Sequence, residues 1–268
     1  MALIKLVKKA ELKSPNLVFI PGGPGLGPNS FDLLSEKIVG VNVFYFYPTG
    51  TILEESGGRT PSVLSYDVQL ADLVNEIKKI KAPILCGHSF GGIIATDLAV
   101  KSPELISGLI CIASPFSKNS FDEVSKNFMA IQNEESETIN NLFEKNPTND
   151  LYKKWFAHYA ELYFSHKNIK NGKKLLLNDS SCVKAYLDAT EEASQKESLL
   201  AEIKSSSVRR IFIAGEEDRL LPPNVLEKDA ASGDYKFISI EYAGHFAHFD
   251  QPDMVSEVII NFILTGGK

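Results

Sequence analysis

A serine stands at the centre of the segment CGHSFGG, residues 86–92, where Gly87, Ser89 and Gly91 follow the pattern Gly-x-Ser-x-Gly. An apolar run precedes this segment and a helical pattern follows it, so it marks a turn from a strand into a helix. Glycines on both sides of such a turn let strand and helix approach without a Cβ clash, and the serine hydroxyl is presented at the carboxyl edge of the sheet. We therefore predict that Ser89 is a nucleophile.

A serine hydroxyl needs a base within hydrogen-bond reach, and that base is oriented by an acid. Of the five histidines in the chain, His245 follows the last strand-like run, where its side chain would reach the same sheet edge as Ser89. His248, three residues later, is the alternative base. His88 adjoins the serine, and because neighbouring side chains diverge on a tight turn, we expect it to pack within that turn.

The acid is expected after the preceding strand, where the sequence from residue 213 reads IAGEEDRLLPP. Asp218 begins the turn that leads to the two prolines, and we predict that it is the acid. Glu216 and Glu217 are interpreted as solvated charges. The chain then contains its nucleophile, acid and base in that order, which differs from the orders in the chymotrypsin and subtilisin arrangements.

A glycine-rich stretch, IPGGPGLG, covers residues 20–27. A phosphate-binding turn would end in Gly-Lys-Ser/Thr, and a dinucleotide-binding turn would read Gly-x-Gly-x-x-Gly; the stretch matches neither pattern. A loop of this kind can instead supply one N–H group to an oxyanion, while the residue after the nucleophile supplies another. Since Pro24 has no N–H group, we predict that Gly23 and Phe90 are the two donors.

Short apolar runs recur along the chain with helical patterns between them. The runs cover residues 17–20, 41–47, 82–87, 105–113, 208–215 and 235–243. Continuous apolar runs are typical of strands in a parallel sheet that is covered on both faces. Their alternation with helices predicts an open α/β fold with right-handed crossovers.

The alternation stops between residues 116 and 206, where only helical patterns recur. We predict a helical cap insertion at 116–206 over a core formed by 1–115 and 207–268. An aromatic stripe in this insertion is expected to be the packing surface of the cap. The alternative is a wall of the substrate site, and a few of its members could serve both roles. The stripe consists of Tyr152, Trp155, Phe156, Tyr159 and Tyr163. Residues 167–174 are interpreted as a solvated turn.

The composition restricts the partners and the setting of the protein. A net charge of −6 speaks against nucleic acid, whose phosphates demand a basic face. The sequence contains no run that is apolar over a membrane thickness and no signal-peptide pattern. Its three cysteines lack metal-site spacing, which favours a reducing compartment. We predict a cytoplasmic protein without metal or cofactor, in which Cys86 and Cys111 are buried; its oligomeric state is not predicted.

With these motifs, the sequence resembles the α/β-hydrolase superfamily over nearly its whole length. The segments GGPG at 22–25, GHSFGG at 87–92, GEED at 215–218 and AGHFAHFDQPD at 243–253 resemble the proline iminopeptidase branch. In that branch the loop reads His-Gly-Gly-Pro-Gly, whereas this chain has Pro21 in the position of the histidine. Family peptidases use cap carboxylates to bind the substrate amine, and the insertion offers Glu134, Glu135, Glu137, Glu161, Asp188, Glu191 and Glu192, none of which the sequence singles out.

The resemblance implies a serine hydrolase that works through an acyl-enzyme on a small-molecule or short peptide substrate. The favoured hypothesis is an aminopeptidase similar to proline iminopeptidase. The alternative is a carboxylesterase or thioesterase of small acyl substrates. A third hypothesis is a non-catalytic member of the fold that binds a ligand or protein through the cap.

Overall fold

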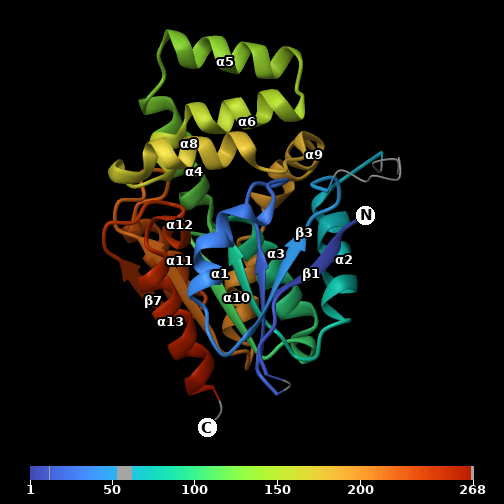
Figure 1. Cartoon of the computed structure of the whole chain (residues 1–268). Coiled ribbons are helices and arrows are strands. Elements are labelled where there is room, and N and C mark those ends of the chain that lie inside the picture. Colours follow the sequence, from blue (N-terminus) through green and yellow to red (C-terminus); the bar gives the residue numbers. More distant parts are fainter. Residues whose placement is uncertain (12, 53–61, 267–268) are drawn as a thin grey trace.

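The computed structural model of the chain describes residues 1–11, 13–52 and 62–266 (Figure 1). Within these residues, seven strands form one sheet in the order β1-β3-β2-β4-β5-β6-β7. The strands are β1 (Leu3–Lys8), β2 (Asn16–Ile20), β3 (Asn42–Tyr47), β4 (Ile84–His88), β5 (Gly108–Ile112), β6 (Arg210–Gly215) and β7 (Lys236–Ile240). All six apolar runs that were predicted as strands of a parallel sheet pair in parallel.

The remaining strand, β1, was not predicted. It pairs antiparallel with β3 at the edge of the sheet, and most of its residues are exposed. An edge strand that carries lysines and buries few side chains lacks the continuous apolar run that identifies the other strands.

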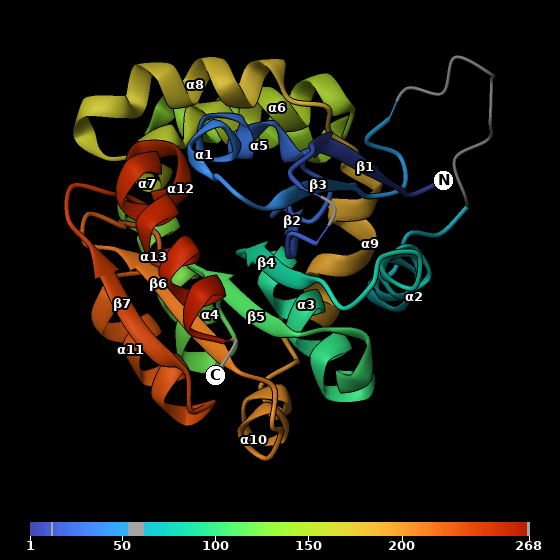
Figure 2. The same cartoon turned by 60° about the horizontal axis from the view of Figure 1, so that its bottom comes forward.

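Helices cover both faces of the sheet (Figure 2). On one face α1 (Asp32–Lys37) and α13 (Pro252–Thr265) pack against each other. The other face is covered by α2 (Tyr66–Ile77), α3 (Phe90–Lys101), α10 (Ser198–Lys204) and α11 (Pro223–Ser232). The central strands β4 and β5 are buried throughout, as expected for a doubly covered parallel sheet. Cys86 and Cys111 lie in these two strands and are buried and free, as predicted.

Further helices lie beyond the carboxyl ends of the parallel strands (Figure 1). They are α4 (Lys118–Ala130), α5 (Glu134–Lys145), α6 (Asn149–His158), α7 (Ala160–Tyr163), α8 (Ile169–Asn178) and α9 (Val183–Ala193). We call α4–α9 and their connections the cap. The predicted insertion ended at residue 206, but its last helix, α10, packs beside α3 and α11 of the core. The division of the chain into domains stays a prediction.

One local prediction in the cap was wrong. Residues 167–174 were interpreted as a solvated turn, yet most of them belong to α8, in which Gly172 and Leu176 are buried. The lysines of this stretch lie on the exposed side of the helix, so a run of charges hid an amphipathic pattern. None of the helices in the described ranges combines the length and apolar character that a membrane-spanning segment requires.

Candidate active site

Ser89 lies on the sharp turn between β4 and α3. Its backbone has φ +51° and ψ −121°, and such a conformation costs about 1–3 kcal/mol. A Cβ on Gly91 would lie 2.4 Å from the carbonyl oxygens of Ile20 and Pro21. One on Gly87 would lie 2.3 Å from the carbonyl oxygen of Gly91. The predicted strained turn is confirmed, and both flanking positions require glycine because the obstructing atoms belong to the backbone.

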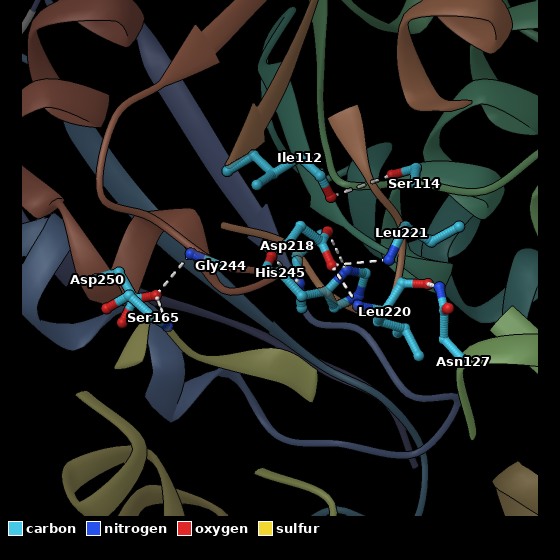
Figure 3. A network of polar contacts seen from close by, with 11 residues as sticks. Ile112, Ser114, Asn127, Ser165, Asp218, Leu220, Leu221, Gly244, His245 and Asp250 are labelled. Carbon is cyan, nitrogen blue, oxygen red and sulfur yellow. Dashed lines mark hydrogen bonds and ion pairs between the residues drawn. The ribbon is translucent and has the colours of Figure 1, made fainter. Parts of the chain in front are cut away.

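The side chains of Asp218 and His245 meet on the loops that follow β6 and β7 (Figure 3). Asp218 Oδ2 lies 2.9 Å from His245 Nδ1, and both side chains are almost wholly buried. Asp218 Oδ1 accepts hydrogen bonds from the amides of Leu220 at 3.0 Å and Leu221 at 2.8 Å. Because the carboxylate is an acceptor, it favours the tautomer in which Nδ1 carries the proton of the imidazole. Nε2 of His245 is then free to accept a proton.

Ser89 and His245 line the same cavity. The hydroxyl of Ser89 makes no hydrogen bond to any part of the chain that the structure describes. Hydrogen bonds between a nucleophile and its base are often long in ligand-free enzymes and shorten in the substrate complex. The fold thus brings the predicted nucleophile to the pair formed by the predicted acid and base.

His88 and His248 lie beside His245 and form a cluster of rings. The ring centroid of His88 lies 4.9 Å from that of His245 and 4.7 Å from that of His248. Burial is the main reason why the pKa of His88 is well below its usual value and that of His248 is lowered to about 3, so both rings are neutral near pH 7. His88 packs within the turn as expected. His248 binds Ser30 Oγ through Nε2 at 3.0 Å and does not line the cavity.

The glycine-rich loop, residues 22–27, contacts the turn at Ser89. A Cβ on Gly22 would lie 3.2 Å from Ser89 Cβ, and both Gly23 and Phe90 line the cavity. Within the described ranges, no group accepts a hydrogen bond from the amide of Gly23. Phe90 is the first residue of α3, where amides have no partner within the helix. Two unpaired N–H groups beside the predicted nucleophile are what the prediction of an oxyanion hole requires. We refer to residues 22–27 by that prediction, as the oxyanion loop.

The cavity in front of Ser89 has a volume of about 150 Å³, which suffices for a molecule the size of benzene when the walls are apolar. The cap contributes a largely aromatic wall. It consists of Phe121, Val124, Phe128, Trp155, Phe156, Tyr163, Tyr186, Thr190 and Ala193. The part of the chain that the structure describes brings no Asp, Glu, Lys or Arg to the lining. These walls therefore suit an uncharged apolar group.

The aromatic stripe of the cap is a packing surface, as predicted, and part of it also lines the cavity. Trp155, Phe156 and Tyr163 line the cavity, whereas Tyr152 and Tyr159 are buried inside the cap and do not line it. The stripe is therefore the core of the cap on one side and a wall of the cavity on the other.

The carboxylates that the sequence offers for an amine site lie elsewhere. None of the seven lines the cavity. Asp188, for example, accepts a hydrogen bond from the amide of Leu64 at 2.7 Å and pairs with Lys184 at 2.8 Å. Within the described residues, the cavity thus has no carboxylate that could bind a substrate amine.

The cap also contacts the loops that carry the acid and the base. The amide of Leu220 donates to Leu162 O at 3.1 Å, and the amide of Phe246 donates to Tyr163 O at 3.1 Å. These are contacts between backbone groups, which carry no sequence motif. The sequence therefore gave no signal that this segment of the cap supports the two loops.

Asp250 joins the same segment of the cap to the loop that carries His245. Its Oδ2 accepts hydrogen bonds from the amides of Ser165 at 2.7 Å and Gly244 at 2.8 Å (Figure 3). Burial raises the pKa of Asp250, and these hydrogen bonds oppose that rise. Since Gly244 directly precedes His245, this carboxylate fixes the backbone next to the predicted base.

Comparison with known proteins identifies related sequences. The sequence model of the alpha/beta hydrolase family matches residues 17–258. Among curated proteins, the chain is 26% identical over 227 residues to a protein of Saccharomyces cerevisiae named "Probable alcohol acetyltransferase". That match covers 75% of this chain and 62% of the relative, so the chain spans less than two thirds of the relative's length.

Solved structures share the fold at low sequence identity. An esterase from Thermogutta terrifontis, with malate bound, has a TM-score of 0.74 and 17% identity, and the match covers 100% of this chain and 94% of the esterase. MenH from S. aureus has a TM-score of 0.68 and 18% identity, with coverage of 100% and 99%. The predicted α/β-hydrolase fold is confirmed. These matches do not single out the proline iminopeptidase branch.

Proposed function

Since the chain belongs to the alpha/beta hydrolase family, we propose that it is a serine esterase that cleaves esters with a small apolar acyl group. The observation that carries this proposal is the lining of the cavity beside Ser89. The cavity measures about 150 Å³, and its described walls are aromatic and aliphatic without a carboxylate. A short acyl chain gains from such walls, because burial of apolar surface is favourable.

An aminopeptidase similar to proline iminopeptidase was the favoured hypothesis from the sequence. Its substrate carries a free ammonium group, and a buried charge is costly unless an opposite charge meets it. The described lining of the cavity offers no such partner. We therefore prefer the esterase to the peptidase, and a prolyl-nitroanilide tests this choice.

In the proposed reaction, His245 Nε2 takes the proton of Ser89 while Oγ attacks the ester carbonyl. Asp218, 2.9 Å from Nδ1, orients the imidazole and stabilises its charged form. The amides of Gly23 and Phe90 donate hydrogen bonds to the oxyanion of the tetrahedral intermediate. The imidazolium then protonates the departing alcohol and leaves an acyl-enzyme. In the second half-reaction His245 takes a proton from water as the water oxygen bonds to the acyl carbon. The bond between that carbon and Ser89 Oγ then breaks, the imidazolium returns its proton to Ser89, and the carboxylic acid leaves.

A second candidate is transfer of the acyl group to an alcohol instead of water. The apolar cavity would favour an alcohol over water as the acceptor at the acyl-enzyme, and the curated relative is named as an alcohol acetyltransferase. In that reaction His245 takes the proton of the incoming alcohol as the alcohol oxygen bonds to the acyl carbon. The ester bond to Ser89 then breaks, and the imidazolium returns its proton to Ser89. The product is a new ester, and the first half-reaction is unchanged.

Initial rates on nitrophenyl acetate, butyrate and octanoate and on a prolyl-nitroanilide test these proposals. We expect the acetate and butyrate to be cleaved fastest and the anilide to resist. Ser89→Ala should lower ester hydrolysis by more than about 1,000-fold, as is typical for loss of a nucleophile. Added ethanol, with the ethyl ester measured by gas chromatography, distinguishes transfer from hydrolysis.

The matched control is Ser256→Ala, since Ser256 is a buried serine of α13 whose hydroxyl donates to Asp253 O at 2.7 Å and which does not line the cavity. We expect its rates to equal those of the wild type. Cleavage of the anilide alone would restore the peptidase hypothesis. If the folded wild type cleaves no substrate and fails to react with a fluorophosphonate, the non-catalytic hypothesis replaces both.

A further inference from the structure

The oxyanion loop takes its hydrogen-bond partners from the cap. The hydroxyl of Tyr152, in α6, donates to Pro24 O at 2.6 Å. The amide of Cys182, just before α9, donates to Gly25 O at 2.7 Å. The carboxylate of Asp179, just after α8, is a third partner of the loop.

Asp179 accepts a hydrogen bond from the amide of Gly27 at 2.7 Å. Its side chain is buried, and burial raises its pKa to about 6, although its bonds to backbone amides and the charge of Lys153 oppose the rise. Together, Tyr152, the amide of Cys182 and this carboxylate give the loop a hydrogen-bond partner at Pro24, Gly25 and Gly27.

The glycines of the loop allow this close approach of the cap. A Cβ on Gly25, which has φ +83°, would lie 2.3 Å from the carbonyl oxygen of Cys182. A Cβ on Gly27 would lie 2.3 Å from Ser180 Oγ. The loop is therefore rich in glycine partly because cap backbone lies against it, and glycine alone leaves room for that backbone.

The loop has little support of its own. Its internal backbone hydrogen bond, from Leu26 N to Gly22 O, is 3.3 Å long, which is at the weak end of the range for N–H···O bonds. Pro24 has no N–H group to contribute. The position of the Gly23 amide, two peptide units before the carbonyl that Tyr152 binds, thus depends on the cap.

We propose that Tyr152 is a positioning residue that fixes the oxyanion loop, so that the Gly23 amide can stabilise the tetrahedral intermediate; this rests on the proposed function. Tyr152 is fully buried and does not line the cavity, so it cannot touch the substrate. Its effect on the reaction passes through Pro24 and the loop. The cap is then part of the catalytic apparatus as well as a wall of the acyl site.

The first test is Tyr152→Phe, which keeps the ring and removes only the hydroxyl. We expect kcat on nitrophenyl acetate to fall about tenfold or more, since loss of a complete oxyanion donor costs about 100- to 1,000-fold. KM should stay within about threefold, because the ground-state carbonyl depends less on these donors than the transition state does.

The second measurement is the affinity for butylboronic acid, which separates positioning from general destabilisation. Ser89 Oγ adds to boron, His245 takes the serine proton, and the tetrahedral adduct places an oxygen at the oxyanion site. Trp155, the single tryptophan of the chain, lines the cavity and reports binding by its fluorescence. We expect the boronate Kd of Tyr152→Phe to rise by about the same factor as kcat falls.

Tyr159→Phe is the matched control. It also removes a buried hydroxyl of the cap, one that binds Asn140 Oδ1 at 2.9 Å within the cap itself, and Tyr159 does not line the cavity. Its kcat and boronate Kd should equal those of the wild type. If Tyr152→Phe behaves like Tyr159→Phe, the positioning role is wrong.

Asp179 provides a second pair of variants in case Tyr152→Phe folds poorly. Asp179→Asn keeps an oxygen acceptor for the Gly27 amide and should retain boronate affinity, whereas Asp179→Ala should lose it. Equal affinities for the two variants contradict the inference. A Ser89→Ala variant as active as the wild type would contradict the proposed function. If hydrolysis depends on Ser89 but the cap variants have no effect, only the positioning role of Tyr152 is wrong.

Discussion

The turn at Ser89 and the oxyanion loop meet at one cavity, but different parts of the protein fix their conformations. The turn is fixed within the core, where Ser89 N donates to Ile112 O at 2.8 Å and backbone atoms surround its glycines. The oxyanion loop is fixed by the cap, through Tyr152, Asp179 and the backbone of Cys182. The strand, turn and helix of the first follow one another in sequence, and their outside contacts come from the neighbouring strands β2 and β5 of the core. The second depends on cap residues more than 100 positions away in the sequence.

This difference separates two kinds of control over one reaction. Changes in the core should remove the chemistry for every substrate, because they alter the nucleophile, its base or the fold. Changes in the cap should alter the rate, the pH dependence or the choice of acyl group and leave the nucleophile in place. Substitutions in the two regions test that separation.

Asp218→Asn should have the largest effect. The new amide would face His245 Nδ1 with an N–H group and favour the wrong tautomer, and in a related triad this change lowers kcat by about 10,000-fold. Both the acetate and the butyrate should be affected alike, as measured by kcat on the two esters. Asp234→Asn is the control, since its side chain is 75% exposed and pairs with Arg210 away from the cavity. A loss that differs between the two esters would contradict a purely chemical role.

Gly91→Ala should unfold the turn. Its Cβ would lie 2.4 Å from two backbone oxygens, and overpacking of this kind costs about 3 kcal/mol in the free energy of unfolding. Gly40→Ala is the comparison, because Gly40 has φ +71° but nothing within 4 Å of its Cβ position; a left-handed conformation alone costs about 1–2 kcal/mol. Urea denaturation measures both. Equal losses would mean that backbone conformation, and not close approach, requires glycine at position 91.

Asp179→Asn should change how stability depends on pH. The pKa of Asp179 is raised from 3.8 to about 6 in the folded protein, so the folded state binds this proton more tightly than the unfolded chain does. The resulting stabilisation is fully present below about pH 4 and is lost as the pH rises through 6; the shift corresponds to about 3 kcal/mol. The free energy of unfolding of the wild type, relative to Asp179→Asn, should therefore fall between pH 4 and pH 8.

Urea titrations of both proteins at the two pH values measure this difference. Asp122→Asn serves as the control, because Asp122 is a cap residue in α4 whose side chain is 65% exposed and pairs with Lys118. A constant difference between the wild type and Asp179→Asn over this range would show that the carboxyl group keeps its ordinary affinity for protons in the folded protein.

Phe128→Ala should have the smallest effect, a change of substrate preference. Phe128 lines the cavity and stacks on Trp155 with ring centroids 5.6 Å apart. Its removal lengthens the space for the acyl chain, and one methylene in an apolar pocket is worth about 1–3 kcal/mol. The ratio of kcat/KM for hexanoate to that for acetate should rise about tenfold. Phe262→Ala, in α13 and outside the cavity lining, should leave the ratio unchanged.

Most of the core was predictable because its signals are local. The buried strands are continuous apolar runs, and the turn at Ser89 has a glycine two positions before the serine and another two positions after it. Asp218 and His245 follow their strands directly, so the topology of a parallel sheet brings them to one edge. The strand β1 escaped prediction because it buries little, and α8 escaped it because lysines cover its exposed side.

Local patterns in the amino-acid sequence were enough to place the candidate groups: Ser89 on a strained turn, and Asp218 and His245 after the last two strands. Only the folded chain shows what surrounds them. Among the described residues, the cap contributes no carboxylate to the lining of the cavity, whose volume is about 150 Å³. The cap also contacts the oxyanion loop through Tyr152 and Asp179. The physical reason is the range of the interactions. Turn geometry depends on neighbouring residues, whereas buried hydrogen bonds between distant segments exist only once the chain has packed.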